Sequence, residues 1–161
     1  MFEATVIRRG LAIVQLNIAS LTVLTKLFLQ DMLEREEGRI LNVSSIASKT
    51  PGPWQSVYHG TKAFVQSFTE ALRSEVKDRG IIVTTLLPGA TDTEFFNKAD
   101  MESSKAVQDM DKLSDPAEVA KDGYEALMSG DDKVISGFKN KVSVTMSNMM
   151  TDSKAADMMK K

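Results

Sequence analysis

RILNVSS, residues 39–45, reads as a short apolar strand that follows a break in the chain at Gly38. IIVTTLLPG, residues 81–89, is a second strand of the same kind, and the turn residues Pro88 and Gly89 end it. In both stretches the apolar residues are continuous rather than alternating, which is typical of strands in a parallel sheet that helices cover on both faces. These two stretches therefore predict a layered α/β fold.

Helices are predicted before and between these strands. From about Leu16 to Glu36, apolar residues recur at steps of three and four, and the breadth of the apolar stripe indicates burial on more than one side. A second helix is predicted from about Ser56 to Arg79, where Gly80 ends it. Its apolar residues lie four positions apart and are Phe64, Phe68, Leu72 and Val76.

The rest of the chain continues the alternation. SDPAEVA (114–120) is a helix start with a capping residue and a proline, and KVISG (133–137) is a third short strand. The tail, 141–161, predicts an amphipathic helix that is interrupted or turned near Asp152 and Ser153. We expect its methionine stripe to pack on its own domain or across a dimer rather than on a membrane. The stripe consists of Met146, Met149, Met150, Met158 and Met159.

Helices and strands thus alternate along the whole chain, beginning and ending with a helix. This order predicts an α/β domain with a parallel sheet and right-handed crossovers. Three strands make a narrow sheet for such a fold, so half of a doubly wound sheet describes the pattern better than a whole one. A chain of 161 residues is long enough to bury a core, and we expect residues 1–161 to form a single domain.

Composition excludes several kinds of site and partner. The chain has no cysteine, which rules out disulfides, thiolate zinc sites and cysteine nucleophiles, and its single histidine, His59, rules out multi-histidine metal sites. A net charge of −2 gives no electrostatic reason to expect a nucleic-acid or anionic-membrane partner. No apolar run approaches the roughly 20 residues of a membrane span, and the start of the sequence lacks the features of a signal peptide. We therefore expect a cytoplasmic protein.

VYHGTKAF, residues 57–64, places Tyr58 four positions before Lys62 on the first turns of a predicted helix, so the two side chains share one face. A cation beside a phenol lowers the pKa of the phenol and prepares it for proton transfer. Ser45 lies at the carboxyl end of the preceding strand, where α/β folds place their ligands. A tyrosine–lysine pair alone is weak evidence, because such pairs arise by chance.

Four short motifs follow one another around this pair. They are QLNIAS, NVSS, YHGTK and PGATDT, and Ser45 precedes Tyr58 by thirteen residues. In their order and spacing these motifs resemble the short-chain dehydrogenase/reductase family, over roughly residues 13–135. The residues that carry the resemblance are Asn17, Ser45, Tyr58, Lys62, Pro88, Gly89 and Thr93.

The resemblance implies a Rossmann-like fold and an oxidoreductase that transfers hydride between NAD or NADP and the alcohol/carbonyl pair of a small-molecule substrate. Tyr58 would exchange a proton with the substrate oxygen, and Ser45 would hydrogen-bond the same oxygen. Lys62 would lower the pKa of Tyr58 and bind the nicotinamide ribose. Asn17 would hold a water that links Lys62 to solvent.

The resemblance also implies a cofactor site and an oligomer. Helices matching 16–36 and 56–79 form the family's paired-helix interface, so a homo-oligomer is expected. Pro88, Gly89 and Thr93 would face the nicotinamide and its carboxamide. With the catalytic pair, the cofactor-binding residues would be Tyr58, Lys62, Pro88, Gly89 and Thr93.

The family's glycine-rich cofactor motif, TGxxxGxG, is missing from this sequence. Its glycines let the backbone approach the pyrophosphate at a helix N-terminus, and no three of the nine glycines here have that spacing. The NNAG strand is missing as well, and a full member would carry on the order of 90 more residues before Asn17. We therefore expect the C-terminal half of a dehydrogenase, with MFEATVIRRGLA as a residual linker and with impaired or no cofactor binding. The alternative is a catalytically silent α/β module that only dimerises or binds a partner.

Three neighbours of the motif residues have ordinary structural interpretations. Ser44 is expected to be a strand-end hydrogen bonder, and Ser48 a loop residue. We expect His59 at the surface, because adjacent helical positions point about 100° apart and Tyr58 already faces the site.

Two stretches keep both interpretations open. Pro53 and Trp54 either border the substrate pocket or make a loop rigid. The segment 93–113 is either the substrate-covering segment that the resemblance implies or a polar connector. A serine–histidine hydrolase is excluded, because Ser45 is not on a G-x-S-x-G elbow.

Overall fold

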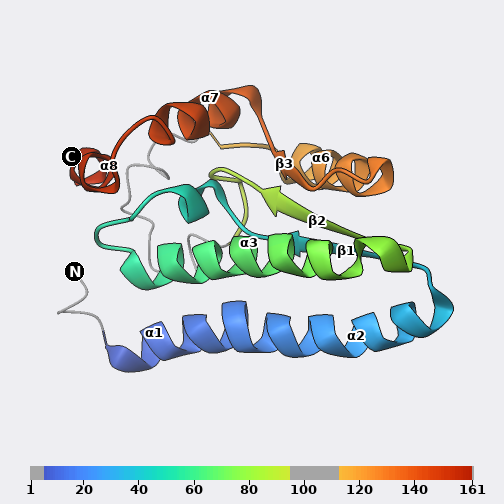
Figure 1. Cartoon of the computed structure of the whole chain (residues 1–161). Coiled ribbons are helices and arrows are strands. Elements are labelled where there is room, and N and C mark those ends of the chain that lie inside the picture. Colours follow the sequence, from blue (N-terminus) through green and yellow to red (C-terminus); the bar gives the residue numbers. More distant parts are fainter. Residues whose placement is uncertain (1–5, 95–112, 161) are drawn as a thin grey trace.

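Three parallel strands with helices on both sides form the described part of the chain in the computed structural model, which covers residues 6–94 and 113–160 (Figure 1). The strands are β1 (Gly38–Val43), β2 (Ile81–Leu87) and β3 (Lys133–Ile135), in that spatial order. Both pairings are parallel. The predicted α/β fold class is thereby confirmed, with all three strands at their predicted places.

A continuous helical rod precedes the sheet. It is made of α1 (Ile7–Val14), the π-helical turn η2 (Gln15–Ser20) and α2 (Leu21–Arg35). The rod begins before the predicted start at Leu16, so the expectation of a linker in MFEATVIRRGLA is wrong from Ile7 onward. The reason lies in the spacing of Ile7, Leu11 and Val14, which extends the apolar pattern of a helix toward the N-terminus.

The remaining helices follow the predicted order. After β1 and the short 3₁₀ turn η3 (Ile46–Lys49), α3 (Ser56–Val76) continues into η4 (Lys77–Arg79). α6 (Pro116–Ser129) begins as predicted, with the Asp115 carboxylate accepting from the amide of Ala117. The tail forms two helices, α7 (Phe138–Ser147) and α8 (Asp152–Met159), so the break falls just before the predicted residues.

The helices lie in two layers around the sheet. The rod and α3 lie on one face, and α6 lies on the other (Figure 1). Side chains on both faces of β1 are therefore covered by helices. Ile40 belongs to the core beneath α2 and α3, whereas Leu41 lies close to Gly123 of α6. This explains why the strand sequence is apolar without alternation.

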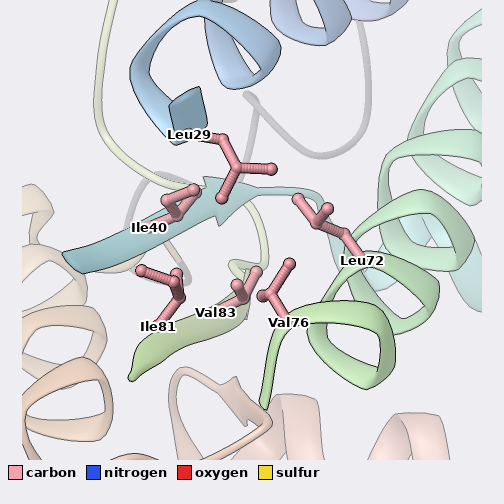
Figure 2. Close-up of a cluster of buried hydrophobic side chains, with 6 residues drawn as sticks. All are labelled: Leu29, Ile40, Leu72, Val76, Ile81 and Val83. Carbon is pink, nitrogen blue, oxygen red and sulfur yellow. The ribbon is translucent and has the colours of Figure 1, made fainter. Parts of the chain in front are cut away.

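A cluster of buried apolar side chains lies between the sheet, α2 and α3. Figure 2 shows its members converging from these elements. The helix stripe predicted for α3 is buried at Leu72 and Val76, while Phe68 packs at the margin of the cluster and Phe64 is half-exposed. The cluster consists of Leu29, Ile40, Leu72, Val76, Ile81 and Val83.

The methionines of the tail pack on this domain only in part: Met150 is half-buried and the Met159 sulfur accepts from the Thr50 hydroxyl (3.4 Å), while the expected packing across a dimer stays a prediction. Met149 is 84% exposed, and Met146 and Met158 are exposed as well. The residues of α7 and α8 that are buried are Val144 and Ala155. Smaller side chains fit closer to the rest of the domain, so the helices turn these inward and most of their methionines outward.

The rod also overturns the expectation that no segment is long and apolar enough to span a membrane. By length and composition, Ile7–Arg35 qualifies: its most apolar window has a mean hydropathy of 1.6, and 6% of that window is buried. Thr25 and Leu29 are the buried residues of α2. Much of the rod therefore presents apolar side chains outward.

One side of β1 has no strand partner within residues 6–94 and 113–160, where β1 pairs with β2 alone. The Ser44 amide donates to the Leu86 carbonyl (2.8 Å) and so points toward β2. Because the hydrogen-bonding groups of successive residues in a strand point to opposite sides, the amide and carbonyl of Val43 point away from β2. The Val43 side chain is 47% exposed. β1 is thus an edge strand in the described structure, although its sequence is that of a covered strand.

Candidate active site

Ser45 is held where β1 ends and η3 begins. Its backbone is extended, and its Oγ accepts a hydrogen bond from the Ala47 amide (3.1 Å), which caps the short turn. The same hydroxyl donates a long bond to the Pro88 carbonyl (3.4 Å) and hydrogen-bonds the Tyr58 phenol. The residue is buried. The turn thus fixes the position of a hydroxyl at the carboxyl end of the sheet.

Tyr58 and Lys62 lie on consecutive turns of α3 and face the same region as Ser45. The Lys62 Nζ is 5.9 Å from the centroid of the Tyr58 ring, as their four-residue spacing predicts. Its ammonium donates to the Val43 carbonyl (3.0 Å) at the unpaired edge of β1. The structure therefore brings Ser45, Tyr58 and Lys62 together.

Burial shifts the pKa values of both members of the pair. Burial raises the pKa of the Tyr58 phenol above its ordinary value, and the hydrogen bond with Ser45 opposes that rise. Burial also lowers the pKa of the Lys62 ammonium. The net shift of the Tyr58 pKa is thus opposite to the expected lowering, because desolvation by burial is its largest cause. At neutral pH Tyr58 is a phenol that can donate a proton.

Replacing Lys62 by methionine is expected to raise the free energy of unfolding at pH 7 by about 0.5–2 kcal/mol, because a thioether is buried at lower cost than an ammonium. The lowered pKa gives the pH dependence. The unfolded chain binds the lysine proton more tightly, so the cost is fully present below the folded-state pKa and fades as pH rises toward 10.5. Urea denaturation between pH 7 and 10 should show the gap between variant and parent narrowing. Exposed Lys26 on α2 supplies the control, Lys26→Met, for which no narrowing is expected.

Asn17 lies in the π-helical turn of the rod. Its Nδ2 donates to the Thr61 hydroxyl (3.0 Å), which in turn donates to the Tyr58 carbonyl (2.8 Å). A π-helical turn is frequent at functional sites because it widens the helix locally. Asn17 is thereby tied to the first turns of α3, one residue from Lys62. Its expected role in holding a water stays a prediction.

A groove of about 480 Å³ lies between the rod and the free side of β1. Apolar side chains of the rod form most of its wall, and Asn17 and Lys62 supply polar groups. The groove therefore runs along the edge of β1 and reaches Lys62. The residues that line the groove include Leu16, Asn17, Leu24, Phe28, Val43 and Lys62.

The residues after β2 border the site in part. The Pro88 carbonyl accepts from the Ile46 amide (3.0 Å) as well as from the Ser45 hydroxyl, so Pro88 adjoins the Ser45 turn. A Cβ at Gly89 would overlap the side chain of Asn140, so glycine is needed there for the approach of α7. Thr93 is exposed. The predicted segment 93–113 falls mostly on 95–112, which lie outside the described residues.

His59 is buried, so the expected surface position is wrong. Its side chain is 7% exposed, and its Nδ1 lies 2.7 Å from the Thr50 carbonyl. A Cβ at Gly52 would overlap the imidazole, which shows how closely the 50–55 loop wraps around the ring. His59 therefore holds this loop. Trp54 in the same loop is exposed and has a left-handed backbone (φ 72°).

Ser44 and Ser48 connect this end of the sheet to α3 by side-chain hydrogen bonds. The Ser44 hydroxyl donates to the Lys62 carbonyl (2.7 Å), which confirms Ser44 as a strand-end hydrogen bonder. The Ser48 hydroxyl lies 2.6 Å from the Gln66 Oε1, a contact that the sequence reasoning missed. The available signal was the continued four-residue spacing of Tyr58, Lys62 and Gln66 along α3.

Comparisons with known proteins identify the family to which the chain is similar. A family model described as short chain dehydrogenase matches residues 4–104. The very-long-chain 3-oxoacyl-CoA reductase of Anas platyrhynchos is 44% identical over 75 residues, which are 47% of this chain and 24% of that protein. The 17-beta-hydroxysteroid dehydrogenase type 3 of Mus musculus is 36% identical over 102 residues, which are 63% of this chain and 33% of that protein.

Solved structures share the fold. A short chain dehydrogenase from Burkholderia cenocepacia J2315 in complex with NADP superposes with a TM-score of 0.78 at 21% identity, over 98% of this chain and 61% of that one. The matches thus span between about a quarter and a third of the two curated relatives and under two thirds of the solved neighbour.

Proposed function

Because the chain belongs to the short-chain dehydrogenase family, as its motifs predicted, we propose that it carries the proton-transfer part of an oxidoreductase that interconverts an alcohol and a carbonyl. The observation that carries the proposal is the Tyr58 phenol, hydrogen-bonded to Ser45 with Lys62 one turn away. In the direction of reduction, Tyr58 gives its proton to the carbonyl oxygen as that oxygen gains negative charge. The Ser45 hydroxyl donates to the same oxygen and stabilises the charge.

The contacts of Ser45 support this division of roles. Its Oγ accepts from the Ala47 amide, which fixes its place, while its bond to the Pro88 carbonyl is long (3.4 Å). A substrate oxygen can replace so long a bond at little cost. The raised pKa of Tyr58 keeps the group a neutral phenol at pH 7, which is the protonation state that a proton donor needs.

A nicotinamide cofactor, NAD or NADP, supplies or accepts the hydride in such a reaction. The residues present fit its ribose: the Lys62 ammonium and the Asn17 amide line one groove, and both can hydrogen-bond hydroxyl groups. The residues do not supply a cradle for the diphosphate, because the nine glycines of the sequence include no TGxxxGxG spacing. Pro88, Gly89 and Thr93 complete the proposed nicotinamide contacts.

Cofactor binding tests the proposal. Titration of the folded chain with NADH and NADPH, followed by nicotinamide fluorescence, is expected to show weak, millimolar binding, because only the ribose end finds ligands. Lys62→Met should weaken this binding further, and the exposed Lys26→Met should leave it unchanged. No response at millimolar cofactor from a folded sample contradicts an enzymatic role for this chain. That outcome favours the second candidate, a silent α/β module, which the unpaired edge of β1 already suggests.

We also propose that the outer face of the rod meets a second copy of the chain in the cytoplasm rather than lipid. Leu24 and Phe28 line the groove, while Val23 and Leu27, about 100° around the helix from them, point away from it and are exposed. The outer face is thus a separate apolar stripe on the helix that the family resemblance assigns to the dimer, and α3 would complete the interface.

Leu27→Glu is expected to weaken self-association at least about tenfold, because it places a carboxylate in an apolar contact. Analytical ultracentrifugation measures this, with Tyr124→Glu on exposed α6 as the control. A monomeric parent chain contradicts the homo-oligomer. A parent chain that sediments with membranes until detergent is added contradicts the cytoplasmic location.

A further inference from the structure

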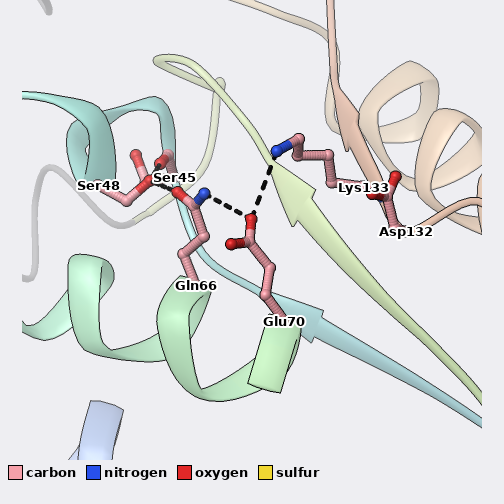
Figure 3. A network of polar contacts seen from close by, with 6 residues as sticks. All are labelled: Ser45, Ser48, Gln66, Glu70, Asp132 and Lys133. Carbon is pink, nitrogen blue, oxygen red and sulfur yellow. Dashed lines mark hydrogen bonds and ion pairs between the residues drawn. The ribbon is translucent and has the colours of Figure 1, made fainter. Parts of the chain in front are cut away.

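A buried glutamine continues the catalytic spacing along α3. Gln66 lies one turn after Lys62 and two turns after Tyr58, yet its side chain is only 7% exposed. A buried amide must find hydrogen-bond partners at both of its ends. Figure 3 shows that it does, between the turn that follows Ser45 and the carboxylate of Glu70.

The partners fix the orientation of this amide. The Gln66 Nε2 donates to Glu70 Oε1 (2.7 Å), and a carboxylate can only accept, so the NH₂ group must face it. The amide oxygen then faces the Ser48 hydroxyl at 2.6 Å and accepts from it. Lys133 Nζ, 3.5 Å from the same Glu70 oxygen, closes the outer end of the network.

Ser48 connects this network to Ser45. Its hydroxyl oxygen lies 2.6 Å from the Ser45 carbonyl, and its amide donates to that carbonyl (3.0 Å). The single hydroxyl proton goes to Gln66, so the amide bond is the one that ties Ser48 to the Ser45 carbonyl. That bond belongs to η3, the turn whose Ala47 amide donates to the Ser45 Oγ. Whatever holds Ser48 therefore also holds the turn that places the Ser45 hydroxyl.

Gln66 ties that turn to the helix that carries Tyr58. Three other bonds join this end of the sheet to α3, from Ser44 to the Lys62 carbonyl, from the Lys62 ammonium to the Val43 carbonyl and from Asn42 to Thr69 (3.1 Å), but all three involve residues before Ser45. The Ser48–Gln66 bond joins α3 to the chain just after Ser45. Ser45 is thus fixed to α3 on both sides, and Gln66 supplies the second side.

We propose that Gln66 is a positioning residue that acts through Ser48 to hold η3 against α3 and so keeps the Ser45 hydroxyl beside the Tyr58 phenol. The catalytic meaning of this rests on the proposed function. The geometry itself is a property of the chain, so its test uses no enzymatic activity and its failure is distinguishable from a failure of the enzymatic assignment.

The Tyr58 phenol can be titrated alone. The chain has two tyrosines, and Tyr124 is exposed on α6, so Tyr124→Phe leaves Tyr58 as the single phenol to be followed by phenolate absorbance. In this background Gln66→Met is expected to raise the midpoint by about 0.5 to 1 pH unit, because the phenolate loses the support of Ser45. Lys62 and His59 stay beside the phenol in every variant, so their effects cancel.

Variants of Ser48 separate positioning from general loosening. Ser48→Ala should raise the midpoint like Gln66→Met, and the double variant should add nothing further, because both act through one bond. Ser48→Thr keeps the hydroxyl and should restore the parent value. Thr69→Val removes the Asn42–Thr69 bond, which joins β1 to α3 before Ser45. It should lower stability while leaving the midpoint of the Tyr58 titration unchanged.

Amide hydrogen exchange at neutral pH gives an independent readout. In Gln66→Met and Ser48→Ala the Ala47 amide should exchange at least about tenfold faster, because its acceptor is the Ser45 Oγ. Amides of β2 should be unaffected. An unchanged or lowered Tyr58 midpoint together with unchanged Ala47 exchange overturns the proposal, and so does an equal effect from Thr69→Val. Should Gln66→Met fail to fold, Ser48→Ala against Ser48→Thr decides the matter.

Discussion

Tyr58→Phe is expected to lower kcat for carbonyl reduction by about 10²–10⁴-fold, the range over which a positioned general acid contributes. The phenol is the proposed proton donor: its raised pKa keeps it protonated at neutral pH, and its hydroxyl is hydrogen-bonded to Ser45. Phenylalanine fills the same volume and leaves Lys62 and the groove in place, so cofactor affinity should change little. Turnover with millimolar NADH or NADPH and fluorescence titration of the same sample measure the two quantities separately.

The matched control for this prediction is Tyr124→Phe, the same substitution at the other tyrosine, which is exposed on α6. It should leave kcat within about twofold of the parent value, as surface changes generally have small effects. Ser45→Ala should also lower kcat, but by less, because Tyr58 keeps its proton. Turnover by Tyr58→Phe at the parent rate would remove Tyr58 from the reaction and leave the fold as the only part of the family assignment that the chain uses.

Local sequence was enough to find the strands and the catalytic spacing. The continuous apolar runs at 39–45 and 81–89 have that composition because Ile40 and Leu41 meet helices on opposite faces of the sheet. Tyr58 and Lys62 meet because a helix stacks positions four apart, which no tertiary contact needs to enforce. Such short-range geometry is encoded residue by residue.

Features that depend on distant partners were beyond local reasoning. His59 is buried because the 50–55 loop folds over it, and nothing in the helix sequence specifies that loop. The direction of the Tyr58 pKa depends on how much protein covers the phenol, which spacing does not reveal. The Ser48–Gln66 bond joins residues eighteen positions apart, so neither residue alone signals the other. The contacts that the sequence did not predict all join one helix or loop to another.

Gly80→Ala is expected to lower the free energy of unfolding by about 2–4 kcal/mol, combining left-handed strain with a steric clash. Gly80 has a φ of 71°, and a Cβ there would lie 2.0 Å from the Glu36 carbonyl oxygen. That oxygen belongs to the turn from α2 into β1, so the clash presses two backbone turns apart at the end of the sheet opposite Ser45. A rigid backbone atom cannot move aside as a flexible side chain can.

Gly60→Ala shows that the effect of Gly80→Ala belongs to the site and not to the residue type. Gly60 is an exposed position within α3, and a Cβ there meets nothing within 4 Å. Alanine should therefore stabilise the helix by about 0.5–1 kcal/mol, the opposite sign from Gly80→Ala. Urea denaturation gives both values from the shift in midpoint at constant slope. Equal destabilisation by both substitutions would contradict the packing of the α2–β1 turn against Gly80.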